Sequence, residues 1–294
     1  MVRDFDTISV VIPTCGRTVE TLSRAVKSVK AQQYAPQEII VVDDNKNNFL
    51  LSQELQKFCA LNQLKYISSG GCGGGGARNC GITNATCKYV AFLDDDDEWL
   101  PNKLKVQLGL FTSSSIGLVY SRGYTVKVNA DGTKTQTAYV TDKYYKTAVS
   151  YRDLLTRNYI GTTTQLLVKR DILLHLNGFD ATLPSRQDYD LCLRVAKEYD
   201  CVGADQYLFR HYIHNCGQIT SSAHSNMKGY QLLLSKYKDD IRKVPDSHRK
   251  FCYRIARCAR KAHIYSTFIE FLLLALADNP LYACETLYKC FGLI

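Results

Sequence analysis

Four consecutive aspartates, Asp94 to Asp97, directly follow an apolar segment that ends at Leu93. Adjacent carboxylates repel one another, so a cation or solvent must screen them in a folded chain. Oxygen ligands of this kind suit hard divalent cations such as Mg²⁺ or Mn²⁺. Such a cation can bridge a diphosphate, and the cluster therefore predicts a metal-assisted diphosphate site. The alternative is a solvated acidic loop that caps a helix beginning near Pro101.

An alternating pattern of strands and helices surrounds this cluster. Short β-rich runs recur at residues 8–12, 38–42, 64–67, 89–93 and 117–120. Between them, apolar residues such as Val19, Leu22 and Val26 recur at helical spacing. The alternation predicts an α/β fold with a mostly parallel, Rossmann-like mixed sheet and flanking helices. Ligands of such sheets bind beyond the carboxyl ends of the strands, where the aspartates stand.

The second half of the chain departs from this alternation. Asp131-Gly132 is a strong turn signal between two alternating segments, residues 124–128 and 133–140, which predicts a hairpin. Further expected elements are a strand at 163–168, a helix at 187–198 and a strand at 206–214.

From residue 224 onward the pattern is helical, with breaks at residues 263–266 and at Asn279-Pro280. We therefore predict an α/β domain over residues 1–223 and a helical C-terminal region over residues 224–294. A tetratricopeptide-like arrangement is one interpretation of this region, and association with a membrane is another.

Composition and charge limit the class of protein. The chain has 294 residues, of which 46% are hydrophobic and 22% charged, which is enough to build a globular core. Its N-terminus is unlike a signal peptide, and its longest apolar run, residues 271–277, is too short to span a membrane. We expect a cytoplasmic protein, or one peripheral at the inner face of the cell membrane. The net charge of +9 favours an anionic partner.

The twelve cysteines are scattered through the chain without a Cys-x-x-Cys pair. This distribution favours reduced, mostly buried thiols over a disulfide framework. A zinc site built from Cys72, Cys80 and Cys87 is an alternative, although their spacing fits no common zinc motif.

Four short segments occur in an order that is typical of one enzyme family. They are Val10-Val11-Ile12-Pro13-Thr14, Val41-Val42-Asp43-Asp44, Gly76-Ala77-Arg78-Asn79 and Phe92-Leu93-Asp94-Asp95-Asp96-Asp97. Over about residues 7–215 the chain resembles glycosyltransferase family 2, and bacterial cell-surface polysaccharide glycosyltransferases in particular. Each segment alone is common, whereas the four in this order are specific. The resemblance implies the GT-A fold, a UDP-sugar donor and inversion at the anomeric carbon.

The resemblance also implies roles in binding the nucleotide. Pro13 and Thr14 would line the nucleotide pocket, and Asp43 or Asp44 would accept a hydrogen bond from the uracil. Arg78 would lie near the diphosphate or the base, because a guanidinium pairs well with anions. The alternatives are a plain turn after the first strand and a helix cap at the two aspartates.

Within the Asp-x-Asp motif, the resemblance makes Asp96 and Asp94 the metal ligands, for Mn²⁺ or Mg²⁺. Asp96 would be the main ligand, Asp94 would lie near the ribose and the donor sugar, and Asp95 would line the donor pocket. The glycine-rich residues 70–76 lack the Gly-Lys-Ser/Thr of a phosphate-binding loop. We predict a flexible loop that carries Arg78 to the donor, with a purely structural linker as the alternative.

The segment from Ser185 to Arg194 is similar to the acidic pair that precedes a helix in the family. The second member of that pair acts as general base, so the resemblance gives this role to Asp188, with Gln187 where Glu is commoner. A positioned carboxylate can remove the proton of an attacking hydroxyl group. Asp190 would point elsewhere on the helix. Alternatively, both acids only stabilise the helix N-terminus, and Arg194 is either an ion-pair partner or a solvated charge.

Three histidines, His211, His214 and His224, follow this helix. One of them could complete a metal or diphosphate site, and a structural or surface role is the alternative for each. Trp99 and residues 159–165 could contact the acceptor or simply pack.

Near the end of the chain, four basic residues share one face of a predicted helix at residues 250–261: Lys250, Arg254, Arg257 and Lys261. Such a face can bind an anionic membrane, which would suit a lipid-linked acceptor, or it can simply be solvated.

The sequence thus predicts a transferase that uses a UDP-sugar donor and a saccharide or lipid-linked saccharide acceptor, without a nucleic-acid partner. One alternative is a nucleotidyltransferase, but Cys15-Gly16-Arg17 is too short for its usual glycine-rich signature. The other is a non-catalytic, basic nucleic-acid-binding protein, for which no recognised motif is present.

Overall fold

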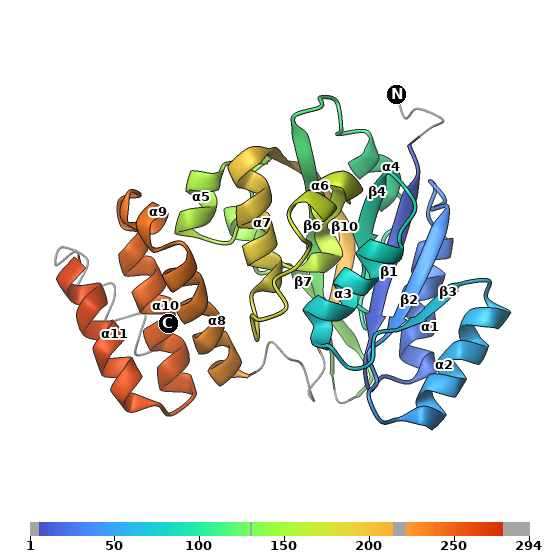
Figure 1. Cartoon of the computed structure of the whole chain (residues 1–294), viewed down its shortest axis with the longest axis horizontal. Coiled ribbons are helices and arrows are strands. Elements are labelled where there is room, and N and C mark those ends of the chain that lie inside the picture. The colour runs from blue at the N-terminus through green and yellow to red at the C-terminus, as the bar shows by residue number, and fades with distance from the viewer. Residues whose placement is uncertain (1–5, 130, 214–221, 279–294) are drawn as a thin grey trace.

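A mixed sheet with helices on both faces forms the centre of the protein (Figure 1). The structure is a computed structural model that describes residues 6–129, 131–213 and 222–278. In this part of the chain the sheet has ten strands, and its main path runs in the order β3-β2-β1-β4-β9-β6-β10-β5. Strand β7 pairs with β6, and β8 pairs with β10.

The N-terminal half alternates strands and helices, which confirms the α/β prediction. Its strands pair in parallel, β1 with both β2 and β4, and β2 with β3. The elements are β1 (Ile8–Thr14), α1 (Val19–Lys30), β2 (Glu38–Asp43), α2 (Phe49–Leu61), β3 (Lys65–Ser68), α3 (Gly73–Asn84), β4 (Tyr89–Phe92), β5 (Glu98–Trp99) and α4 (Lys103–Leu108). The parallel pairing brings the carboxyl ends of β1, β2 and β4 to one edge of the sheet.

The second half adds antiparallel strands and further helices. Strand β9 lies antiparallel between β4 and β6, and β6 pairs in parallel with β10. The elements are β6 (Ile116–Val128), β7 (Lys134–Ala138), η1 (Asp142–Tyr144), β8 (Ala148–Val149), α5 (Tyr151–Thr156), η2 (Thr163–Gln165), β9 (Leu167–Lys169), α6 (Arg170–His175), α7 (Gln187–Glu198) and β10 (Asp200–Ile213).

Two details of the second half differ from the sequence prediction. The predicted hairpin is present as β6 and β7, but β6 is continuous with the core strand that was expected to be separate. The strand expected at residues 163–168 begins instead as the 3-10 turn η2, and only Leu167–Lys169 pair as β9. The turn places the three threonines at 162, 163 and 164 beside the acidic cluster rather than in the sheet.

Two hydrophobic clusters fill the two faces of the sheet. The alternation of side chains along β1 sends Val11 into one cluster, and Val10 and Ile12 into the other. The first cluster includes residues of α3, α5, α6 and α7, and the second includes residues of α1, α2 and α4. The sheet is therefore a buried scaffold whose carboxyl edge can carry a site.

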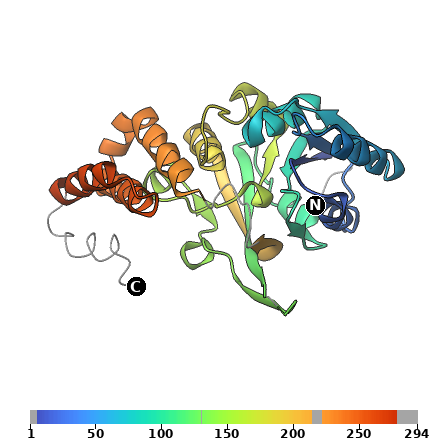
Figure 2. The same ribbon diagram turned by 90° about the horizontal axis from the view of Figure 1, so that it is seen from below.

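The C-terminal helices are α8 (Ala223–Lys236), α9 (Lys238–Arg242), α10 (Ser247–Lys261) and α11 (Tyr265–Asp278). They lie beside the sheet, at the end away from the N-terminal strands (Figure 2). Leu233, Tyr237 and Phe251 belong to the first sheet cluster, so these helices pack on the α/β core. Helices α10 and α11 form one antiparallel pair (Figure 1). The turn between them overlaps the predicted break at residues 263–266. The second predicted break, at Asn279-Pro280, lies outside the described residues.

Membrane crossing by a helix finds no support in this part of the chain. None of its helices is both long and apolar enough for a membrane span.

Candidate active site

The four aspartates form a turn immediately after β4. The amide of Asp97 donates to the carbonyl of Asp94 at 3.0 Å, which closes the turn. Thr164, from η2, fixes both ends: its hydroxyl accepts from the Asp94 amide at 3.2 Å and donates to Asp97 Oδ2 at 2.6 Å. These residues, called the acid turn below, therefore lie at the carboxyl edge of the sheet, as predicted.

Asp94 is paired with Arg78, which comes from the second turn of α3. Arg78 Nη2 lies 2.5 Å from Asp94 Oδ1, and the hydroxyl of Thr163 donates to the same oxygen at 3.0 Å. Burial alone would raise the pKa of Asp94, but the charge and hydrogen bond of Arg78 outweigh burial and lower it. Asp94 is therefore ionised, and Arg78 lies at the acid turn.

Asp96 is held by two arginines that the sequence interpretation missed. Arg17, in the loop after β1, pairs with Asp96 Oδ2 at 2.9 Å. Arg24, on α1, donates to the carbonyl oxygen of Asp96 at 2.5 Å and stacks on the ring of Tyr212 at 4.0 Å. The only sequence signal for Arg17 was its place just beyond a strand that ends at the same edge. Arg24 gave no signal, because its role depends on how α1 packs.

The positive charge of Arg17 does not balance the negative charges around Asp95 and Asp96. Burial, together with Asp96 and Asp94, raises the pKa of Asp95 to about 7, against the nearby Thr14 hydroxyl and the charge of Arg17. Burial, together with Asp97 and Asp94, raises the pKa of Asp96 to about 6. Additional positive charge would lower both pKa values.

The acid turn fits a divalent cation that is shared with a substrate. Among the described residues, no three His, Cys, Asp or Glu side chains form a metal-binding group. Mg²⁺ usually takes one or two carboxylates and completes its shell with water and substrate phosphates, so Asp94 and Asp96 are sufficient. The same finding speaks against the zinc alternative at Cys72, Cys80 and Cys87.

Of the three candidate histidines, His211 lies at the acid turn. Its Nδ1 is 3.0 Å from Oδ1 of the fully buried Asp97. Burial lowers the pKa of His211, but Asp97, Asp94 and Asp96 outweigh burial and raise it to about 9. His224 is exposed on α8, and His214 lies outside the described residues. The buried partner fixes the His211 ring, which leaves Nε2 for other contacts.

The aspartates at the end of β2 have different surroundings. Asp43 is fully buried, and its two oxygens accept hydrogen bonds from Asn45 and from the Tyr66 hydroxyl, at 2.6 and 2.7 Å. Asp44 Oδ1 accepts from Ser69 at 2.6 Å and from the Cys72 amide at 2.7 Å. Asp43 thus stabilises the chain internally, and Asp44 ties β2 to the start of α3.

Pro13 and Thr14 end β1 beside these aspartates. Pro13 is half-buried and pairs with Val42 of β2, and Thr14 is buried next to Asp95. The predicted nucleotide-pocket residues are therefore gathered at one edge of the sheet, with the acid turn.

The glycine-rich segment is a loop only over residues 70–72, in contrast to the loop over residues 70–76 that the sequence suggested. Residues from Gly73 onward form the first turns of α3, which also carries Arg78. Packing of Ala77 and Ile82 into the first sheet cluster explains this helix in spite of the low helix propensity of glycine. A Cβ atom on Gly75 would lie 2.9 Å from the terminal amide of Gln187, so α3 and the start of α7 approach closely at this glycine.

Asp188 lies in the first turn of α7 and faces the acid turn. Burial raises its pKa, against the charges of Arg186 and Arg78 and a hydrogen bond from the Tyr189 amide, while Asp94 raises it further. The neighbouring Gln187 lies against α3, the helix that carries Arg78, at Gly75. Asp188 therefore lies near Arg78 and Asp94, within range of their charges.

Tyr139, which the sequence interpretation did not single out, lies near these groups. Burial and the charges of Asp188, Asp97 and Asp94 all raise the pKa of its hydroxyl. Its ring also meets His211 edge-on, with centroids 5.5 Å apart. No feature of the sequence distinguished Tyr139 from the other nineteen tyrosines in the chain.

Trp99 has the packing role that was its alternative. It is 2% exposed and its indole N–H donates to the carbonyl of Thr164 at 3.1 Å. In the loop over residues 159–165, Thr162 and Thr163 contact Asp94. These threonines shape the acid turn.

Comparison with known proteins identifies the family. The family model described as glycosyl transferase family 2 matches residues 9–176. A colanic acid biosynthesis glycosyl transferase of Escherichia coli K12, WcaA, is 33% identical over 269 residues, which cover 83% of this chain and 86% of that one. The chain belongs to glycosyltransferase family 2. This family 2 enzyme is therefore a glycosyltransferase, and a nucleotidyltransferase activity is not its class of reaction.

Further relatives and solved structures agree with the family 2 assignment. The Escherichia coli UDP-Glc:alpha-D-GlcNAc-diphosphoundecaprenol beta-1,3-glucosyltransferase WfgD is 28% identical, over 65% of this chain and 70% of its own. The structure of Staphylococcus aureus TarS 1–349 with UDP-GlcNAc matches with a TM-score of 0.56 and 16% identity, over 90% and 89% of the two chains. A mannosyltransferase from Pyrobaculum calidifontis with GDP-Man and Mn²⁺ gives a TM-score of 0.62 at 15% identity, over 97% and 79%. These structures establish the GT-A fold.

Proposed function

We propose that this enzyme transfers a sugar from a UDP-sugar to a saccharide or lipid-linked saccharide, with inversion, during synthesis of a cell-surface polysaccharide. The names of its relatives support the pathway and the substrates: they refer to colanic acid, to amylovoran, and to a glucosyl transfer from UDP-Glc onto a diphosphoundecaprenol-linked sugar. The single observation that carries the proposal is that Asp188 lies within range of the charges of the paired Asp94 and Arg78.

On the donor side, we assign the uracil to Asp44 rather than Asp43. Asp43 is fully buried and both of its oxygens are already used inside the protein. Asp44 keeps Oδ2 for a further hydrogen bond, since Ser69 and Cys72 engage Oδ1. Pro13 and Thr14 would form the adjoining wall of the nucleotide pocket.

The arginines of the acid turn suit the diphosphate. Arg78 and Arg17 each hold a carboxylate, and a guanidinium can exchange a carboxylate for a phosphate oxygen of similar geometry. Asp96 and Asp94 would then be free to hold Mn²⁺ or Mg²⁺. When bound, the cation supplies positive charge for the leaving diphosphate. His211, oriented by Asp97, lies near the carboxylates of Asp94 and Asp96, whose charges act on it.

On the acceptor side, we assign Asp188 as the general base. Its raised pKa places it nearer to the working pH than an exposed aspartate, which favours proton transfer. It would take the proton of the acceptor hydroxyl while that oxygen attacks the anomeric carbon. A single displacement of this kind inverts the configuration, because the nucleophile enters opposite the leaving diphosphate.

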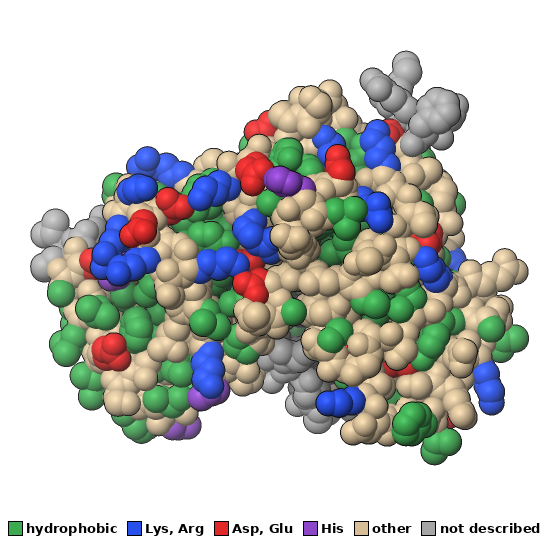
Figure 3. Space-filling view, in the orientation of Figure 1, with side chains coloured by type: hydrophobic (Ala, Val, Ile, Leu, Met, Phe, Trp, Pro, Cys, Tyr) green, Lys and Arg blue, Asp and Glu red, His purple; other side chains and the backbone are tan. Residues whose placement is uncertain are grey.

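Two of the four basic residues on the predicted face of α10 already have partners within the protein. Lys250 pairs with Asp246 at 3.1 Å, and Arg254 donates to the carbonyl of Thr156 at 2.7 Å. Arg257 and Lys261 are exposed. Basic side chains also gather over the C-terminal helices on the face shown in Figure 3. We propose that this region meets the anionic inner face of the membrane.

Donor hydrolysis tests the proposal without knowledge of the acceptor. The purified protein is mixed with Mn²⁺ and a panel of UDP-glucose, UDP-galactose, UDP-N-acetylglucosamine and GDP-mannose, and release of the nucleoside diphosphate is followed. We expect one UDP-sugar to be hydrolysed, Asp96→Ala to abolish both this reaction and Mn²⁺-dependent UDP binding, and Asp205→Asn, on an exposed carboxylate elsewhere, to change neither. If no UDP-sugar is bound or hydrolysed, or if Asp96→Ala behaves like the control, the proposal is wrong.

A further inference from the structure

Helix α8 packs directly on the segment that leads into α7. The hydroxyl of Ser185 donates to the carbonyl of Ser225 at 2.9 Å. A Cβ atom on Gly229 would lie 2.3 Å from Ser185 Oγ and 2.9 Å from its carbonyl oxygen, so only glycine allows this approach. The guanidinium of Arg186 stacks over the ring of Tyr230 at 4.5 Å. The first turns of α8 therefore hold the residues that lead into α7.

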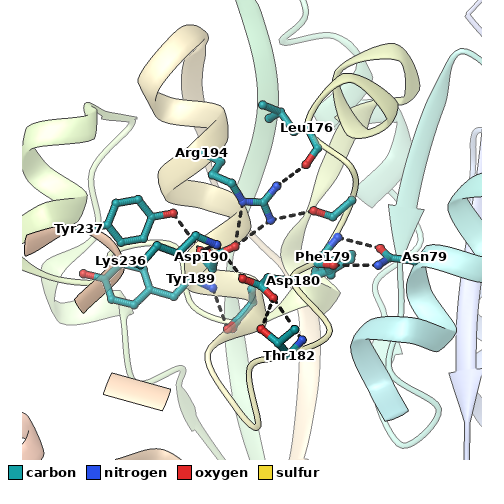
Figure 4. A network of polar contacts seen from close by, with 12 residues as sticks. Asn79, Leu176, Phe179, Asp180, Thr182, Tyr189, Asp190, Arg194, Lys236 and Tyr237 are labelled. Atoms are coloured by element: carbon teal, nitrogen blue, oxygen red, sulfur yellow. Dashed lines mark hydrogen bonds and ion pairs between the residues drawn. The ribbon is translucent and has the colours of Figure 1, made fainter. Parts of the chain in front are cut away.

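The end of α8 and the residue after it contact a further position on α7, Asp190, as Figure 4 shows. Asp190 is fully buried; its Oδ2 accepts a hydrogen bond from Arg194 Nε at 2.8 Å and forms an ion pair with Arg194 Nη2 at 2.8 Å. Its Oδ1 accepts a hydrogen bond from the Tyr237 hydroxyl and forms an ion pair with Lys236 Nζ, both at 2.8 Å. A buried carboxylate is costly unless it is fully hydrogen-bonded, so this arrangement holds Asp190 firmly in place.

The same contacts reach the helix that carries Arg78. Lys236 also pairs with Asp180 at 2.7 Å, in the loop before α7. In that loop, the backbone of Phe179 exchanges two hydrogen bonds with the side chain of Asn79 on α3, both 2.7 Å long (Figure 4). Helix α8 thus connects to α7, which carries Asp188, and to α3, which carries Arg78.

We propose that Lys236 and Tyr237 are positioning residues for Asp188, which they hold in place through Asp190. The proposal rests on the proposed function, in which Asp188 is the base. The two aspartates lie two residues apart on α7, so Asp190 points into the packed core and Asp188 points to the opposite side of the helix. Any rotation of the first turn at Asp190 therefore moves the Asp188 carboxylate.

The size of the effect follows from the demands of proton transfer. A displacement of about 1 Å of a catalytic group can cost on the order of 100-fold in rate. Tyr237→Phe removes one hydroxyl and keeps the buried ring, so the protein should fold and lose part of this restraint. Tyr151→Phe is the matched control, because its hydroxyl also donates to a carboxylate, Asp240, at 2.7 Å, but at α9 instead of α7.

Three readouts separate positioning from a merely structural role. For Tyr237→Phe and Lys236→Met we expect kcat for hydrolysis of the preferred UDP-sugar to fall by about tenfold. For Tyr237→Phe, affinity for UDP with Mn²⁺ should stay within about twofold, and hydrogen exchange of the amides at 187–190 should quicken. Lys236→Arg should restore most of the rate lost in Lys236→Met, and Tyr151→Phe should match the wild type.

The inference and the proposed function can fail separately. If Tyr237→Phe lowers the melting temperature but leaves both kcat and amide exchange at wild-type values, Lys236 and Tyr237 are not positioning residues. If Asp188→Asn retains hydrolysis, the assignment of the base is wrong, whatever Tyr237→Phe does. Faster exchange in Tyr237→Phe, with the control unchanged, supports the link between α8 and α7 even if the donor is a different sugar nucleotide.

Discussion

Asp94, Asp95 and Asp96 are adjacent in the chain, yet their pKa values move in opposite directions. Asp94 faces Arg78 and has a lowered pKa, whereas burial and neighbouring carboxylates raise the pKa of Asp95 to about 7 and that of Asp96 to about 6. The charge that the protein itself supplies is thus enough for one carboxylate and too little for three. Such a deficit is expected where a cation arrives with the substrate.

Asp95 should therefore cost stability at neutral pH. Its pKa is about 7 in the folded protein and near 4 in an unfolded chain, so folding takes up a proton between these values. The free energy of unfolding must then fall as the pH rises from about 4 to 7. Replacing Asp95 with Asn removes this penalty, and we expect urea denaturation in EDTA at pH 8 to show a gain of roughly 1 to 4 kcal/mol.

The pH dependence is the control for this variant. At pH 4 the wild-type carboxyl is neutral in the folded protein and only about half ionised in the unfolded chain, so Asp95→Asn should have little effect there. An equal gain at pH 4 and pH 8 would mean that packing, and not charge, explains it. A loss of stability at pH 8 would contradict the raised pKa.

The residue types of the acid turn could be predicted from sequence, whereas their partners could not. An Asp-x-Asp after an apolar strand is a local pattern, and the structure places Asp94 and Asp96 accordingly. Arg17, Arg24 and Tyr139 come from three other elements and meet the turn only after tertiary packing. Spacing along the chain carries no information about such meetings.

Helices and strands show the same division between local and tertiary information. The strands of the N-terminal half follow from apolar periodicity, and β1, β2 and β4 formed where the sequence predicted them. Helix α3 was missed because its first turn, Gly73 to Gly76, has a low intrinsic helix propensity. Packing of Ala77 and Ile82 into the first sheet cluster compensates for that propensity, and the approach of Gln187, 112 residues further along, favours glycine at position 75.

Gly75 provides a test of this explanation. In the wild-type background, Gly75→Ala should bring no gain or a small loss of stability, because the new Cβ atom would lie 2.9 Å from the terminal amide of Gln187 and push it aside. In a Gln187→Ala background the obstacle is gone, and the same change should add roughly 0.5 to 1 kcal/mol through helix propensity. Urea denaturation of the four proteins in this double-mutant cycle measures both effects. If Gly75→Ala has the same effect in both backgrounds, the contact does not explain the glycine.

For the molecule as a whole, the sequence predicted a boundary near residue 223 and a helical region after it. Helix α8 does begin at Ala223, but its residue Leu233 and the following Tyr237 belong to the same cluster as the sheet. Sequence periodicity finds the apolar face of a helix and does not reveal what that face covers. The contact of α8 with the start of α7 could therefore not be predicted from the sequence.

The exposed basic residues of α10 carry a prediction about the whole molecule. Replacing both Arg257 and Lys261 with Ala should weaken binding to vesicles that contain anionic lipid, by about 1 kcal/mol per residue, or roughly 30-fold in total. Lys27 and Lys57, exposed on α1 and α2, give a control with the same loss of charge. Vesicle sedimentation measures the difference. Equal weakening in both double variants would show a general charge effect and no binding face.

The most direct test of the account compares two quantities in the Asp188→Asn variant: affinity for UDP with Mn²⁺, by calorimetry, and the rate of donor hydrolysis. Asparagine keeps the shape of the side chain but cannot take a proton. We expect affinity within about twofold of the wild type and a rate that is lower by about 100-fold or more. A variant that binds UDP and still hydrolyses the donor at the wild-type rate would contradict the role of Asp188 as base.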